Sequence, residues 1–169
     1  VAVADNFLYT RGNYEQRRFS SKIFESLREA LEVSLTDTSI TGALAQNISR
    51  DQEPLVWAET QNNLGNILAA MGQQRRDAEL FERAIQCFSN ALEEFGQESS
   101  PLEWAATQYN LGTANQSLGR LLEATQPLKI AVDAYTNALL VWTREKSPEG
   151  WTYTMHQLGV ALHTYGKLL

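Results

Sequence analysis

The chain has 169 residues, about the length of one ordinary domain. It is 43% hydrophobic and 20% charged, a balance typical of globular rather than disordered or fibrous proteins. Its formal net charge of -6, from 14 basic and 20 acidic residues, argues against nucleic acid or an anionic membrane as the main partner, because both favour a basic face.

Residues 1–50 are predicted to form an N-terminal helical capping segment. Apolar residues recur at helical spacing between Phe19 and Leu35, with charged residues on the remaining positions. A further short helix is expected within residues 37–49. Because the end of a repeat stack must be sealed from water, we expect this segment to cover the repeats that follow it.

From residue 51 onward the chain repeats itself with a period of 47 residues. The landmarks that keep this period are Pro54, Pro101 and Pro148; Trp57, Trp104 and Trp151; Leu64-Gly65, Leu111-Gly112 and Leu158-Gly159; and Gly72, Gly119 and Gly166. The region 51–169 therefore contains two whole repeats, 54–100 and 101–147, and a partial one, 148–169. Because the sequence opens with Val1 and stops inside a repeat, we expect it to be part of a longer protein.

Each repeat is predicted to hold two helices. In the first helix of the first repeat, one face carries Trp57, Gln61, Leu64, Leu68 and Met71. Ser100 before Pro101, with Glu103 three residues on, predicts a capping box with proline at the first helical position, and Ser147 before Pro148 predicts the same cap without the box. The first helices are expected to end at the glycines of the period, Gly72, Gly119 and Gly166, where a left-handed residue is favourable.

The second helix of each repeat carries small and aromatic residues at helical spacing. These residues are Ala84, Phe88, Ala91 and Leu92 in the first repeat and Ala131, Tyr135, Ala138 and Leu139 in the second. Alanines beside large rings allow two helices to approach closely. Because Pro127 disfavours helix just before it, we expect that helix to begin near residue 127 and residues 120–126 to form a loop or a short separate turn.

In this register the sequence resembles the tetratricopeptide repeat family. The family signature is Trp, Leu-Gly, Gly, then Ala-x-x-x-Phe/Tyr-x-x-Ala, then Pro. The matching residues are Trp57, Leu64-Gly65, Gly72, Ala84, Phe88, Ala91 and Pro101, and then Trp104, Leu111-Gly112, Gly119, Ala131, Tyr135, Ala138 and Pro148. The unit is longer than the roughly 34 residues usual for the family. We expect the extra residues to lie between the two helices of each repeat, near 73–80 and 120–127.

The resemblance implies an all-α fold, a right-handed superhelical solenoid of antiparallel helix pairs. It also implies a concave groove lined by the first helices of the repeats. The predicted binding residues of this groove are Asn62, Asn63, Asn66, Tyr109, Asn110, Thr113, Tyr153, His156 and Gln157. The set is neutral and rich in amides, which can both donate to and accept from an extended peptide backbone. An equally physical alternative is that the asparagines tie each first helix to the backbone of its neighbour.

The residues that could support catalysis or hold a metal are few. His156 and His163 lie two helical turns apart, roughly 10 Å, which is too far to share one metal ion directly. Cys87 is expected to be a buried and unreactive thiol, and a single cysteine excludes a disulfide framework. The acidic residues Glu79, Glu82, Glu93, Glu94 and Glu98 are expected on the second helix of the first repeat, as a solvated face or a docking patch for a basic partner.

The sequence thus predicts a non-enzymatic module without cofactor or metal that binds a peptide or partner protein in its groove. One alternative is a regulatory sensor arm of a larger signalling protein. Another is a scaffold that dimerises through its terminal repeat. No stretch approaches the roughly 20 apolar residues of a membrane span, and no signal peptide is evident, so we expect a cytoplasmic location without membrane insertion.

Overall fold

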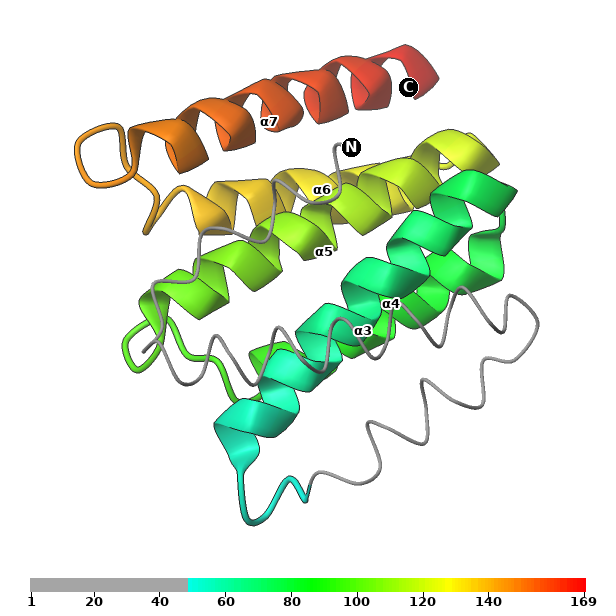
Figure 1. Cartoon of the computed structure of the whole chain (residues 1–169). Helices are drawn as coiled ribbons and strands as arrows, with labels where there is room; N and C mark the ends of the chain where they lie inside the picture. Colours follow the sequence, from blue (N-terminus) through cyan, green and yellow to red (C-terminus); the bar gives the residue numbers. More distant parts are fainter. Residues whose placement is uncertain (1–48) are drawn as a thin grey trace. The chain divides into compact units, whose positions relative to one another are not determined.

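The computed structural model in Figure 1 describes residues 49–169. In this range every regular element is an α-helix and no strand occurs, so the prediction of an all-α protein is confirmed there. The helices are α3 (Pro54–Arg75), α4 (Ala78–Leu92), α5 (Pro101–Leu122), α6 (Thr125–Ala138) and α7 (Pro148–Leu168). The capping helices predicted within residues 1–48 lie outside the described residues. Contacts divide the chain into two compact units, 1–57 and 58–169, and the buried apolar residues of the described range lie in the second.

Helices α3 and α4 form an antiparallel pair built on two glycines of α3. A β-carbon added at Gly65 would lie 2.6 Å from the ring of Phe88. One added at Gly72 would lie 3.2 Å from the ring of Phe81. Because the later glycine meets the earlier aromatic residue, the two helices run in opposite directions, and the absent side chains let the rings approach the α3 backbone.

Helices α5 and α6 repeat this arrangement at the same register. A β-carbon at Gly112 would lie 2.7 Å from the Tyr135 ring, and one at Gly119 would lie 2.7 Å from Cγ of Leu128. Both Tyr135 and Leu128 are fully buried, with 0% of their surface exposed. The 47-residue period of the sequence is therefore also a period of helix packing.

Helix α7 packs against α6 and α5 through one face (Figure 1). Its buried residues are Gly150, Thr154 and Ala161. Ala161 joins a core cluster with Ala131 and Tyr135 of α6. The other faces of α7 carry exposed residues, including glycines and large apolar side chains.

The glycines of the period do not end the first helices, so that prediction was wrong. Both α3 and α5 continue past them, and the left-handed residues are Arg76 (φ 54) and Glu123 (φ 51). The carbonyls of Gly72 and Gly119 instead accept hydrogen bonds from the backbone N–H groups of Asp77 (3.0 Å) and Ala124 (2.9 Å). This six-residue closure is the Schellman arrangement, in which the residue before the donor is left-handed. In α7, Gly166 likewise lies inside the helix.

The loops predicted between the paired helices, near 73–80 and 120–127, are mostly helical. Helix α5 runs to Leu122 and α6 begins at Thr125, so most of the predicted loop at 120–126 is helical. Pro127 is accommodated in the first turn of α6, where a backbone N–H has no helical partner. Only two residues connect the helices of each pair.

The predicted N-cap positions are correct, but their side chains make no capping bond. Ser100 and Ser147 immediately precede α5 and α7, with Pro at the first helical position and no side-chain hydrogen bond to the helix. The cap with side-chain bonds is Asp77, whose Oδ1 accepts from the backbone N–H of Glu79 (2.9 Å) and Leu80 (3.5 Å). This start of α4 was not predicted from the sequence.

Alanine at Gly112 and at Gly159, which are equivalent positions in α5 and α7, should shift stability in opposite directions. At Gly112 the added carbon meets the Tyr135 ring, so we expect the free energy of unfolding to fall by about 1–2 kcal/mol. At Gly159 no described atom lies within 4 Å of the added β-carbon. Alanine there should therefore raise the free energy of unfolding by up to about 1 kcal/mol, because its helix propensity is higher than that of glycine. Urea unfolding measures both, and shifts of the same sign would contradict this packing.

Candidate functional site

The predicted binding residues come from three helices, α3, α5 and α7, which side-chain hydrogen bonds join in series. Asn62 Oδ1 on α3 accepts from Asn110 Nδ2 on α5 at 3.1 Å. Gln116 Nε2 on α5 donates to Gln157 Oε1 on α7 at 3.3 Å. The first helices of successive repeats therefore lie side by side and share a surface, which we call the first-helix surface.

Asn62 and Asn110 are partly used in holding α3 and α5 together. Asn62 Oδ1 also lies 3.3 Å from the hydroxyl of Thr107, which is buried between the helices. This agrees with the alternative that the asparagines tie neighbouring helices, although the partner is a side chain and not the backbone. Asn110 is half-buried, and its Oδ1 has no hydrogen-bond partner among the described residues.

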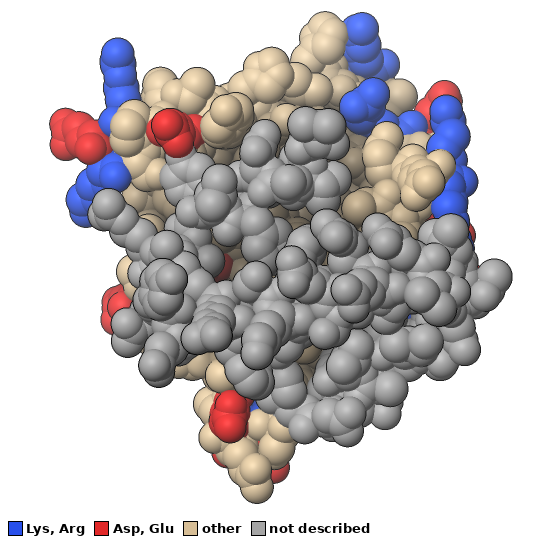
Figure 2. Space-filling model, in the orientation of Figure 1, with Lys and Arg blue, Asp and Glu red and all other residues tan. Residues whose placement is uncertain are grey.

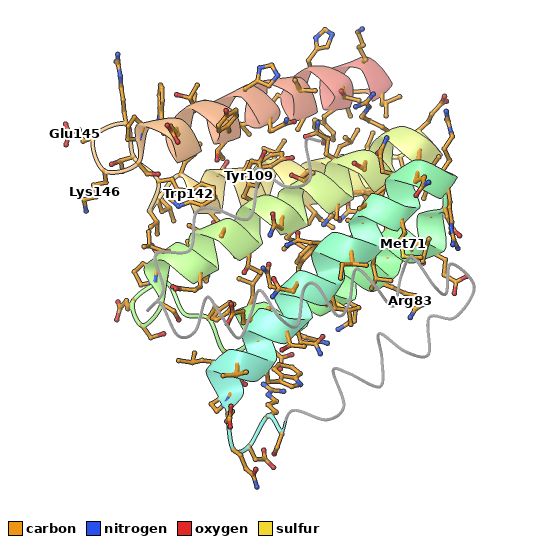
Figure 3. The ribbon with its side chains drawn as sticks, in the orientation of Figure 1. Met71, Arg83, Tyr109, Trp142, Glu145 and Lys146 are labelled. Carbon is orange, nitrogen blue, oxygen red and sulfur yellow. The ribbon has the colours of Figure 1, made fainter. Side chains whose placement is uncertain are left out.

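Tyr109 and Thr113 are built into the packing between α5 and α6. The Tyr109 ring centroid lies 5.7 Å from that of Tyr135 and 5.8 Å from that of Trp142, and both ring pairs are tilted. Figure 3 labels Tyr109 and Trp142, which lie close together. Thr113 Oγ1 donates to the Tyr109 carbonyl at 3.0 Å and lies 3.2 Å from the Tyr135 hydroxyl. Burial raises the pKa of Tyr109, opposed by Thr113 and reinforced by nearby Tyr153. Both residues therefore have a structural role in addition to any binding role.

The remaining predicted residues differ widely in exposure. Tyr153 and His156 on α7 are exposed, Tyr153 to 63%. Asn66 on α3 is half-buried, and Asn63 is buried with 6% exposed. The most accessible part of the first-helix surface is therefore on α7, and the least accessible predicted residue is Asn63.

Two polar features of the core were not predicted from the sequence. The first is a repeated amide pair: Asn90 Nδ2 donates to Gln61 Oε1 (3.3 Å), and Asn137 Nδ2 donates to Gln108 Oε1 (3.5 Å). The signal was present, because both partners recur at the 47-residue period. Each pair links the first and second helix of one repeat.

The second feature is a hydrogen-bond chain through three helices of the second unit. The buried Tyr135 hydroxyl donates to Gln116 Oε1 at 2.9 Å, and Gln116 in turn donates to Gln157. Burial raises the pKa of Tyr135 well above its ordinary value, with Thr113 opposing the shift. At the equivalent positions the first repeat has Phe88 and Ala69, so it lacks both the hydroxyl and its acceptor. The two groups are present together in the second repeat and absent together from the first.

Cys87 lies on α4 and is buried, as predicted from the sequence. Burial raises the pKa of its thiol from 9.0 to about 11, against a smaller opposing effect of the Arg83 guanidinium. A thiol reacts as the thiolate, so this cysteine is protonated and unreactive near neutral pH.

The Cys87 shift predicts a loss of stability at alkaline pH. From pH 9.0 to about 11 the thiol ionises in the unfolded chain but stays protonated in the folded one, so the stability present below pH 9.0 is lost across this window. The loss should be about 2 kcal/mol. Urea unfolding of wild type and Cys87→Ala at about pH 8 and about pH 10.5 measures it, because the variant lacks this contribution. Equal falls in both proteins would contradict the shift.

The histidines and glutamates considered as metal ligands or as a docking patch do not gather at one place. His156 and His163 are both exposed on α7. Among residues 49–169, no group of three or more His, Cys, Asp and Glu side chains could hold a metal ion. Of the five acidic residues expected on α4, only Glu79 and Glu82 lie on it, because the helix ends at Leu92 and the other three follow it. The prediction of one acidic helix face was therefore wrong.

Comparison of the chain with protein-family models, with curated proteins and with solved structures finds no match. Within the described range, none of the helices has the length and apolar character needed to cross a membrane.

Proposed function

We propose that this chain is a non-catalytic protein-interaction module that binds an extended segment of a partner protein along its first-helix surface. The observation that carries the proposal is the lateral joining of α3, α5 and α7 by the Asn62–Asn110 and Gln116–Gln157 hydrogen bonds. It brings repeat-equivalent side chains from three helices onto one surface, which is the arrangement that an extended ligand requires.

The overall arrangement that we propose is a right-handed solenoid of the tetratricopeptide kind. Antiparallel pairs with the same glycine-to-ring contact in α3–α4 and α5–α6 support it. So does the order of packing, in which α5 contacts α4 and α6, and α7 contacts α6 and α5.

The recognition chemistry would be hydrogen bonding with aromatic contact. Asn110 Oδ1 can accept from a ligand backbone N–H while its Nδ2 stays bound to Asn62. Tyr153 and His156 supply accessible rings for contact with ligand side chains. Because none of the nine predicted positions is Lys or Arg, a clamp for a terminal carboxylate is not part of the proposal.

Selection of a displayed random-peptide library on the immobilised chain tests this function. The affinity of each selected peptide is then measured on wild type, on Asn110→Ala/Tyr153→Ala, and on the control Lys129→Ala, which changes an exposed residue of α6. We expect the double variant to weaken binding at least about tenfold, or 1.4 kcal/mol, and the control to leave it unchanged. Circular dichroism checks that the helices remain intact. Equal binding by all three proteins would refute the first-helix surface as the site.

A further inference from the structure

The repeat-equivalent residues Asn110 and Gln157 use opposite ends of their amides to reach the preceding first helix. Asn110 donates through Nδ2 to Asn62 Oδ1 on α3, at 3.1 Å. Gln157 instead accepts through Oε1 from Gln116 Nε2 on α5, at 3.3 Å. The amide end that remains is therefore an acceptor, Oδ1, at Asn110 and a donor, Nε2, at Gln157.

Both of these remaining groups reach the surface of the molecule. Neither Asn110 Oδ1 nor Gln157 Nε2 has a hydrogen-bond partner among the described residues. Within the described range, every buried side-chain nitrogen or oxygen of a residue that is not itself exposed does have a partner. Because Asn110 and Gln157 are half-buried, their two unpaired atoms must lie where a ligand can contact them. Asn110 keeps this access with a neighbouring first helix on each side of α5, so the position is accessible inside the stack.

A buried hydroxyl holds the Gln157 amide in its orientation. Tyr135 is 0% exposed, and its hydroxyl donates to Gln116 Oε1 at 2.9 Å. Because the oxygen and nitrogen of an amide point in different directions, Gln116 then turns Nε2 toward α7, and Gln157 must meet it with Oε1. Turning Gln157 over would place two N–H donors against each other and leave a buried donor without an acceptor.

Amide groups rather than charges give α5 and α7 their polarity. The Asp, Glu, Lys and Arg residues of these helices are Glu103 and Glu149 in the first turns and Arg120 and Lys167 in the last turns. In the face shown in Figure 2, the Lys and Arg side chains likewise lie toward the ends of the helices. A ligand that crosses the middle of α5 and α7 therefore meets neutral hydrogen-bonding groups.

An extended polypeptide needs both kinds of group from such a surface. The N–H and the C=O of one residue point to the same side of a strand. A surface that offered only acceptors, or only donors, would leave half of these ligand groups without a partner, which is costly once water is excluded. An acceptor at Asn110 and a donor at Gln157 match the two groups.

We propose that Tyr135 and Gln116 are positioning residues of the first-helix surface. They set Gln157 to donate to a backbone carbonyl of the ligand, while Asn110 accepts from a backbone N–H. Because this role rests on the proposed function, it adds the chemistry of two contacts to the same site. The ligand is a segment whose backbone N–H and C=O groups are not paired in a helix or sheet of its own.

Urea unfolding of the chain without ligand tests the positioning of Gln157. Glutamate at this position can only accept and lysine can only donate, so Gln116 Nε2 satisfies Gln157→Glu but not Gln157→Lys. We expect Gln157→Glu to unfold at the higher urea concentration, although the net charge of -6 alone would favour the lysine. With Tyr135→Phe, Gln116 is free to turn Oε1 toward α7. The difference between the two variants should then fall to that between Gln97→Glu and Gln97→Lys, which change an exposed residue outside the helices.

Two results of the unfolding experiment would overturn the positioning role. The first is a midpoint for Gln157→Glu that is below that of Gln157→Lys or differs from it only as the Gln97 pair differs. The second is a difference that persists in Tyr135→Phe, since Gln116 would then keep its orientation without the hydroxyl.

Peptides selected from the random library test the contact with the ligand. Gln157→Glu keeps the bond from Gln116 and removes the outward donor. We therefore expect it to weaken, at least about tenfold, the binding of peptides that Asn110→Ala/Tyr153→Ala also weakens. Gln97→Glu adds the same carboxylate elsewhere and should leave binding unchanged.

The two experiments separate failure of this contact from failure of the proposed function. Equal binding by Gln157→Glu and wild type, with Asn110→Ala/Tyr153→Ala still defective, would overturn the donor role of Gln157 and leave the proposed function standing. A library that yields no peptide would refute the proposed function and the ligand contact with it. The urea experiment would then still decide whether Tyr135 sets the orientation of Gln157.

Discussion

Replacing Tyr135 with alanine should lower the free energy of unfolding by about 3–5 kcal/mol, the range for removing a large buried aromatic ring. Tyr135 is fully buried, its ring lies over the backbone at Gly112, and it belongs to the cluster that joins α6 to α7 through Ala161. Alanine would leave a cavity at a point where three helices meet. Urea unfolding followed by circular dichroism measures the change.

A second substitution at the same position separates the ring from the hydroxyl. Tyr135→Phe keeps the ring, as Phe88 does in the first repeat, but leaves Gln116 Oε1 without its donor. We expect a loss of about 1–2 kcal/mol from the unpaired buried acceptor. Adding Gln116→Ala, which reproduces Ala69 of the first repeat, should recover part of that loss. A loss on Tyr135→Ala no larger than that on Tyr135→Phe would show that the ring is not a core residue.

Leu128→Ala should cost about 2–5 kcal/mol, the second large effect. Leu128 is fully buried in the first turns of α6 and occupies the space left by Gly119 of α5. The site cannot collapse easily, because the Schellman closure of α5 at Ala124 fixes the chain just before α6. The measurement is the same urea unfolding experiment.

Leu140→Ala is the matched control for this prediction. Leu140 follows α6 and is 59% exposed, so the same change of side chain should shift stability by less than about 0.5 kcal/mol. Similar losses for Leu128→Ala and Leu140→Ala would contradict the position of α6 against α5.

The helix pairs could be predicted from the sequence because each element carries its own periodic signal. The stripe around Leu64 and Leu68 and the alanines around Phe88 specify helices whose apolar faces must be covered. The ends of the helices were harder. A glycine such as Gly72 is as suitable for close packing as for a left-handed cap, and only the position of the Phe81 ring decides which role it has.

The candidate site could be predicted only in outline. The repeat period correctly placed Asn62, Asn110 and Gln157 on neighbouring first helices. It could not tell an accessible amide from one already bonded, because the Asn62–Asn110 hydrogen bond joins residues of different repeats. Tyr109 also looked like a surface residue from its wheel position, whereas its ring packs beside Tyr135 and Trp142.

The sequence by itself determined the helical class, the period and the division of each repeat into two helices, because these depend on patterns that recur along one chain. The tertiary structure alone decided which copies of the pattern are buried against another helix. Gly112 and Gly159 are equivalent in sequence, yet one lies under a tyrosine ring and the other is exposed. Burial depends on what a distant part of the chain places against a residue, and that information is absent from the local pattern.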